Sequence, residues 1–242
     1  MKLSLITVTY NCEKTICKCL ASVSKQSYKN IEYIVVDGKS SDATIKLINS
    51  YSKIIDKFIS EPDEGIYDAI NKGIRMATGE IIGLLHADDV FFSDNTLHDI
   101  MNKFINQNID FLYGDVEIFK NIHDSKPIRR WTSNKFHPFL LNLGWMPPHT
   151  SMFVKSSLYS EFGLFDTSFS ISGDYDFILR VFKNRKLNAY YMPETLVKMM
   201  HGGVSTKNFN SFLLKSKEDL KALKKNKIIY PRLALFFKKL LK

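Results

Sequence analysis

The first 90 residues alternate strand-like runs with helical patterns, and this alternation constrains the fold more than any other feature. Runs typical of strands cover Lys2–Tyr10, Ile31–Val36, Phe58–Ser60 and Ile81–Leu85. The segments between them carry apolar residues at helical spacing. A β-α-β-α-β-α-β order predicts a parallel sheet, because parallel neighbours need a long crossover connection. We therefore expect an α/β fold with a Rossmann-like, mostly parallel sheet flanked by helices.

Acidic residues follow two of these predicted strands. Asp37 ends the second strand, and Asp88 and Asp89 follow the fourth. Ligands of open parallel sheets bind outside the carboxyl ends of the strands. Two adjacent carboxylates at a buried strand end repel each other, and a divalent cation would offset that repulsion. The pair therefore predicts a Mg or Mn site that grips a diphosphate, although either acid could instead cap the helix expected around Asn95–Asn106.

The second half carries acids and histidines in unusual contexts. Asp174 and Asp176 lie at the start of a predicted helix, where a carboxylate could act as general base towards a sugar hydroxyl. Equally, both acids could only complement the helix N-terminus. His149 follows two prolines, and His201 precedes two glycines, which let backbone approach a ligand closely. His201 is thus a candidate ligand of the metal or the diphosphate, although isolated histidines are often structural.

Several motifs together resemble the inverting family 2 glycosyltransferases, which have the GT-A fold. The motifs are Thr7-Val8-Thr9-Tyr10-Asn11, Val35–Asp42 and Ala87-Asp88-Asp89. The segment from Glu61 to Gly73, with Ala77-Thr78-Gly79-Glu80, is similar to the O-antigen and capsule branch of WfgS-like and colanic-acid transferases. The resemblance extends from Lys2 to about Val204. It implies an enzyme that takes a nucleotide-diphosphate sugar as donor.

The resemblance also implies roles on the donor side. Thr9, Tyr10 and Asp37 would line the nucleotide site. Asp88 would contact the ribose or support the metal, and Asp89 would bind the Mg or Mn ion. Many relatives have a second acid after the one at Asp37, and it often reads the base. This chain has Gly38 there, so the resemblance alone does not fix a preference for uridine.

On the acceptor side, the resemblance makes Asp174 the catalytic base. His149 would border the acceptor cleft, with Asp176 as a neighbouring acid. Many relatives have a glutamate before the base, whereas this chain has Gly173. The loss of one like charge should ease ionisation of Asp174.

The chain has a net charge of +9, but most of this charge lies near its C-terminus. Residues 215–242 contain ten Lys and Arg and only two acids. From Pro231 onwards, apolar residues recur at helical spacing, with basic residues largely on the other side. The apolar positions are Leu233, Phe236, Phe237, Leu240 and Leu241. This pattern predicts a short helix that contacts an anionic membrane surface, or else one that packs on the domain.

We therefore expect a GT-A domain over 1–210, with a nucleotide-sugar half at about 1–115 and an acceptor half at about 116–210. A basic amphipathic extension would follow over 211–242. The apolar runs are too short to span a bilayer, and no secretory signal is evident. We expect a cytoplasmic enzyme, peripheral on the inner face of the cell membrane.

The expected reaction is transfer of one sugar, with inversion, to a polyprenyl-diphosphate-linked glycan of a bacterial surface polysaccharide. One alternative is a nucleotidyltransferase, but the sequence lacks the glycine-rich phosphate loops that such chemistry favours. Another is a non-catalytic nucleic-acid-binding protein. Basic charge confined to the tail disfavours nucleic acid as a partner.

Overall fold

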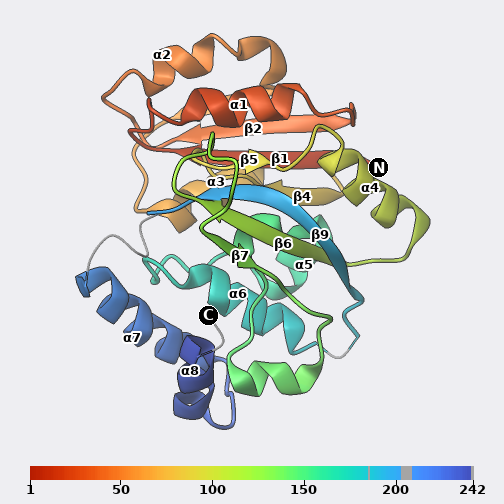
Figure 1. Cartoon of the computed structure of the whole chain (residues 1–242), viewed down its shortest axis with the longest axis vertical. Helices are drawn as coiled ribbons and strands as arrows, with labels where there is room; N and C mark the ends of the chain where they lie inside the picture. The colour runs from red at the N-terminus through yellow and green to blue at the C-terminus, as the bar shows by residue number, and fades with distance from the viewer. Residues whose placement is uncertain (185, 203–208, 241–242) are drawn as a thin grey trace.

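A curved nine-stranded sheet forms the centre of the molecule in the computed structural model, which describes residues 1–184, 186–202 and 209–240 (Figure 1). The strand order is β3-β2-β1-β4-β8-β6-β9-β5, and β7 pairs with β6 outside this path. The strands are β1 (Leu3–Thr9), β2 (Ile31–Asp37), β3 (Lys57–Ser60), β4 (Ile81–Leu84), β5 (Val90–Phe91), β6 (Phe111–Phe119), β7 (Arg129–Trp131), β8 (Phe153–Lys155) and β9 (Ala189–Met200).

The first four strands in this order pair in parallel, as the alternating sequence pattern predicts. Alternation along β1 sends Leu3 and Leu5 to one face and Ile6 to the other, because successive side chains of a strand point to opposite faces. The α/β fold with a mostly parallel sheet is therefore confirmed. The sequence did not reveal that β8 pairs antiparallel between β4 and β6, or that β9 is a long strand.

Helices cover both faces of the sheet. On one face, the core is shared with α1 (Ile16–Ser24), α2 (Thr44–Asn49) and α4 (Thr96–Asn106). On the other face, it is shared with α3 (Ile66–Met76), α5 (Ser156–Phe162) and α6 (Gly173–Phe182). Short 3-10 segments are η1 (Ser52–Ile54), η2 (Pro138–Leu143) and η3 (His149–Ser151). Among the described residues, no helix is both long and apolar enough to cross a membrane.

The chain ends in two helices, α7 (Phe209–Lys225) and α8 (Pro231–Leu240), which pack under α6 and η2 (Figure 1). Glu218 of α7 accepts three backbone hydrogen bonds, from the N–H groups of Ser170, Ile171 and Ser172 at 2.8–2.9 Å. The buried Lys238 of α8 pairs with Asp219 at 2.9 Å. Lys238 therefore lies inside the fold and not on the solvated basic face that the helical pattern predicts. The boundary expected at 210/211 stays a prediction.

Candidate active site

The loops after β1, β2 and β3 meet at the carboxyl end of the sheet, around Asp37. This side chain is fully buried and accepts hydrogen bonds from the hydroxyls of Thr9, Ser40 and Ser60 and from the backbone N–H of Ser40, at 2.5–2.9 Å. Burial alone would raise the pKa of Asp37, but these hydrogen bonds outweigh it and lower the pKa. Asp37 and Thr9 thus shape the loops, whereas the neighbouring Tyr10 is 67% exposed.

The acidic pair lies in the turn after β4. Asp89 is buried, and its Oδ1 accepts the backbone N–H of Met200 at 3.2 Å. Its Oδ2 is buried and has no hydrogen-bond partner among the described residues. Burial and the charge of Asp88 raise the pKa of Asp89 well above its ordinary value. A carboxylate in this state is a good cation ligand, because a nearby positive charge would remove the penalty for ionising it.

His201 follows Met200 in the turn after β9, so it is one residue from the backbone contact to Asp89. Its own N–H donates to the carbonyl of Phe119 at 2.8 Å, and its side chain is exposed. Within the described ranges, no three His, Cys, Asp or Glu side chains form a group that could hold a metal ion. The role of His201 as a metal ligand therefore stays a prediction.

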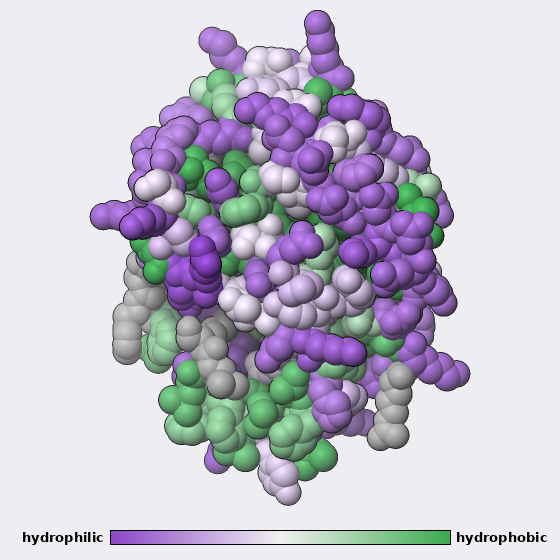
Figure 2. All heavy atoms as spheres, turned by 45° about the vertical axis from the view of Figure 1, so that its right-hand side comes forward, coloured by the Kyte–Doolittle hydropathy of each residue, from purple (hydrophilic) through white to green (hydrophobic). Residues whose placement is uncertain are grey.

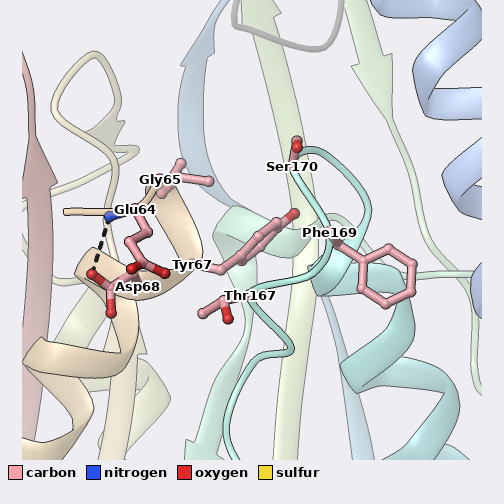
Figure 3. Close-up of a pocket in the computed structure, with 8 residues that line it drawn as sticks. Glu64, Gly65, Tyr67, Asp68, Thr167, Phe169 and Ser170 are labelled. Carbon is pink, nitrogen blue, oxygen red and sulfur yellow. Dashed lines mark hydrogen bonds between the residues drawn. The ribbon is translucent and has the colours of Figure 1, made fainter.

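Asp174 lies in the first turn of α6, and only 13% of its side chain is exposed. Its Oδ1 accepts the hydroxyl of Tyr67 at 3.3 Å, and its Oδ2 lies 3.5 Å from Nδ1 of His149. Tyr67 also donates to the carbonyl of Ile171 at 2.6 Å. Figure 3 shows the Tyr67 ring reaching from α3 to the loop that precedes α6. Two distant segments thus hold the carboxyl of Asp174 in place.

The charge state of Asp174 is decided by opposing effects. Burial raises its pKa, but the positive charges of His149, Lys215 and Lys238 and the N–H of Tyr175 outweigh burial. The pKa of Asp174 therefore lies below its ordinary value. The side chain is a carboxylate at neutral pH, which is the form that a general base requires.

Asp176, expected on the acceptor side, is fully buried. It accepts hydrogen bonds from Arg180 at 2.9 Å, Lys225 at 3.1 Å and Asn226 at 2.9 Å. These partners tie α6 to the end of α7. The oxygens of Asp176 are enclosed and already used by the protein, and its expected place on the acceptor side stays a prediction.

A small pocket lies between the first turn of α3 and the loop before α6 (Figure 3). Its lining residues are Glu64, Gly65, Ile66, Tyr67, Asp68, Thr167, Phe169 and Ser170. Neither the acidic pair after β4 nor Asp174 lines it. The candidate site described above is therefore distinct from this pocket, although Tyr67 belongs to both.

Comparison with known families shows which family the chain belongs to. The family model described as "Glycosyl transferase family 2" matches residues 4–163, about two thirds of the chain. The chain belongs to glycosyl transferase family 2. This family 2 enzyme is therefore a glycosyltransferase, as the strand-end motifs predicted.

Curated relatives of this glycosyltransferase come from several bacteria. A PGL/p-HBAD biosynthesis glycosyltransferase of Mycobacterium bovis (strain BCG / Pasteur 1173P2) is 29% identical over 194 residues, which are 78% of this chain and 73% of that protein. An uncharacterized glycosyltransferase of Rickettsia prowazekii (strain Madrid E) is 30% identical over 223 residues, which are 90% of this chain and 69% of the relative.

Solved structures confirm the GT-A type of fold. S. aureus TarS 1-349 superposes with a TM-score of 0.72 at 20% identity, covering 98% of this chain and 70% of that one. A TarS 1-349 complex with UDP-GlcNAc gives 0.72 at 19% identity, covering 92% and 67%. The mannosyltransferase PcManGT from Pyrobaculum calidifontis, in complex with GDP-Man and Mn2+, gives 0.69 at 16%, covering 99% and 73%.

His86 lies close to the candidate site residue His149, and sequence reasoning missed it. Its ring centroid lies 5.4 Å from that of His149. Burial lowers the pKa of His86, while the charges of Asp88 and Asp174 oppose that effect. His86 therefore lies within electrostatic reach of both acids. The sequence could have singled out His86 by its position directly after the fourth predicted strand and two residues before Asp88.

Proposed function

We propose that this enzyme transfers a single sugar from a nucleotide-diphosphate donor, with UDP as the preferred carrier, with inversion at the anomeric carbon. One observation carries the proposal. The ring of His86, two residues before Asp88, lies 5.4 Å from the ring of His149, and Nδ1 of His149 lies 3.5 Å from Oδ2 of Asp174. Two neighbouring histidine rings thus connect the turn that carries the acidic pair to the proposed general base. The TarS complex with UDP-GlcNAc supports the choice of carrier.

In this proposal, Asp174 accepts the proton of the attacking acceptor hydroxyl. Tyr67 orients its Oδ1, and His149 keeps the carboxyl ionised and borders the space where the acceptor hydroxyl would arrive. Attack then displaces the nucleoside diphosphate in one step, so the configuration inverts. A positioned base of this kind typically contributes about 10²- to 10⁴-fold in rate.

Asp88 and Asp89 fit a divalent cation, Mg or Mn, because the buried Oδ2 of Asp89 has no hydrogen-bond partner in the part of the chain that the structure describes. When bound, such an ion would neutralise the charge that develops on the diphosphate. His201 is one residue from the Asp89 contact and is the further candidate ligand. The PcManGT complex with GDP-Man and Mn2+ supports the use of a metal.

The proposed acceptor is a polyprenyl-diphosphate-linked glycan at an anionic membrane surface, with the product entering a bacterial surface polysaccharide such as O-antigen or capsule. Apolar side chains support this proposal. Figure 2 shows them gathered at the lower end of the molecule, where α7, α8 and η2 lie in Figure 1. The exposed members are Phe139, Phe212, Leu213, Leu214, Ile229, Tyr230, Leu233, Phe236 and Leu240. We call this set the apolar end.

The donor site is tested by calorimetric titration of UDP, with and without Mn, into wild type and Asp89→Asn. Asparagine keeps an acceptor for the Met200 N–H but removes the charge. Since the folded pKa of Asp89 is raised, its ionised form destabilises the metal-free protein increasingly as pH rises. We therefore expect Asp89→Asn to raise the Tm at pH 7 and to abolish metal-dependent UDP binding. Metal-dependent UDP binding that is unchanged in Asp89→Asn would show that Asp89 is not part of the donor site.

A further inference from the structure

The space beside Gly38 is occupied by an acidic side chain from another loop. The loop after β3, residues 61–65, reaches over the end of β2. A Cβ built on Gly38 would collide with Oδ2 of Asp63. The carboxylate of Asp63 therefore fills the space that a side chain at position 38 would enter.

The exposed ring of Tyr10 borders the same space. The Cδ2 atom of Tyr10 lies 3.3 Å from the Cβ built on Gly38. The exposed ring offers a face on which a nucleotide base can stack, and the carboxylate beside it can accept a hydrogen bond from the edge of that base. Both side chains lie at the carboxyl end of parallel strands, where such sheets bind nucleotides.

Asp37 and Asp63, the two acids beside Gly38, differ in whether a carboxylate oxygen is available to a ligand. All the protein hydrogen bonds of Asp37 are made inside the fold, and it is fully buried. Asp63 is half-buried, and its Oδ1 accepts the N–H of Gly65 at 3.0 Å. No hydrogen bond to its Oδ2 is formed by the part of the chain that the structure describes. Asp63 is thus the acid with an oxygen available to a ligand.

We propose that Asp63 is the base-reading residue of the donor site, and that its Oδ2 accepts the ring N–H of uracil or guanine while the base lies against Tyr10. This inference rests on the proposed nucleotide-diphosphate donor. A carboxylate can only accept, so it favours a base with a ring N–H at this position. Cytosine and adenine present a lone pair there and would be disfavoured.

The test compares Kd values of UDP, GDP, CDP and ADP for the full chain in the presence of Mn, by calorimetry. Wild type should bind UDP or GDP at least about tenfold more tightly than CDP and ADP, since a hydrogen bond to a charged group is lost with the latter. The UDP and GDP arms distinguish a pyrimidine from a purine carrier.

In Asp63→Asn, the amide oxygen can keep the Gly65 N–H, which leaves the NH₂ group to face the base. That group only donates, so it should disfavour the ring N–H of uracil and donate a hydrogen bond to the unprotonated ring nitrogen of cytosine. We expect the UDP-to-CDP affinity ratio to fall by about tenfold or more. Glu64→Gln removes one charge from the same loop and should leave the ratio unchanged.

A second pair of variants distinguishes recognition of the base by a carboxylate from an effect of Asp63 on the structure of its loop. Asp63→Ala should lose the discrimination, and adding Gly38→Asp should restore it by returning a carboxylate to the same space. The backbone at Gly38 is not left-handed, so it accepts a side chain once Asp63 is shortened. Nucleotide binding with a ratio that both Asp63 variants leave unchanged, or a wild type that prefers CDP or ADP, would overturn the inference alone. No binding of any nucleotide would overturn the proposed donor as well.

Discussion

Asp174 is almost enclosed by protein, and its carboxyl is nevertheless held in the ionised state by positive neighbours. Asp174→Asn keeps the shape and removes the proton acceptor. We expect kcat to fall by about 10²- to 10⁴-fold, with UDP affinity within about twofold of wild type. Radiolabelled sugar transfer and calorimetry measure the two quantities. Glu161→Gln, an exposed acid on α5, is the control; a matching loss there, or retained turnover in Asp174→Asn, would contradict the assignment.

His149 acts on Asp174 through charge, and this gives a pH dependence. Burial raises the pKa of Asp174 and the charge of His149 lowers it, so the pKa of Asp174 should rise when the histidine is removed. His149→Gln should therefore move the acidic limb of the kcat/KM profile to higher pH. The activity loss should be larger at pH 5 than at pH 8. A limb that stays in place would show that His149 does not set the charge of Asp174.

At the residue scale, sequence reasoning found acids by their type and position but could not assess their partners. Asp89 lies in the turn after β4 and Asp174 in the first turn of α6, and their roles stay predictions. Asp176 looked equally available, yet Lys225 and Asn226, about fifty positions away, enclose it. Asp63 was overlooked for the same reason, because its proximity to Gly38 depends on how two loops fold over each other.

At the element scale, Glu32 ties β2 to its neighbours. It accepts hydrogen bonds from the Ser4 hydroxyl of β1 at 2.5 Å and from the backbone N–H and hydroxyl of Thr78 at 2.8 Å. Lys2 and Lys57 lie 3.1 and 2.9 Å from its Oε1. Burial would raise the pKa of Glu32, but these partners together lower it far below its ordinary range.

Glu32→Gln should destabilise the protein by about 2 kcal/mol at pH 7, because hydrogen bonds to a charged group are lost. The folded pKa of Glu32 is lowered, so its stabilising contribution is complete above the unfolded pKa, about 4, and is lost as pH falls towards the folded value. Urea unfolding at pH 7 and pH 3 measures the difference between wild type and variant. A difference that does not shrink at pH 3 would contradict an ionic role.

Elements were predictable where the pattern is local. The β-α alternation of the first 90 residues follows from spacing and turn residues alone. The insertion of β8 and the pairing of β9 with β6 do not, because these strands pair with residues 41 to 81 positions away and the pairing depends on tertiary packing. The same holds for α7, whose polar sequence gives little sign of the buried Glu218.

At the scale of the whole molecule, the apolar end is expected to meet an anionic bilayer. Leu233, Phe236 and Leu240 of α8 are 49%, 56% and 65% exposed, and the exposed Arg232 and Lys239 lie on the same helix. Replacing the three apolar residues by serine should lower partitioning onto phosphatidylglycerol vesicles at least about tenfold, since each loses apolar area. Cosedimentation measures this partitioning.

Point substitutions are the suitable test because α8 is part of the fold. A Cβ on Gly144 would collide with the backbone of Ala234, and Lys238 packs over the ring of Tyr175. Deleting residues 228–242 would therefore uncover the core as well as remove the apolar end. Ile128→Ser, at a residue 53% exposed on another surface, is the matched control. Equal vesicle binding by the triple variant and wild type would contradict the proposal that the apolar end contacts a membrane.

The hydrogen bonds from residues 170–172 to Glu218 affect how truncated alleles of the gene should be interpreted. The family-matched segment stops at residue 163, yet the proposed base follows at Asp174, and the backbone leading to it is fastened by a side chain from α7. A premature stop codon after position 205 would spare every motif that marks the family and still remove that fastening. Alleles truncated there should be scored as loss-of-function, although a motif scan would count them as intact.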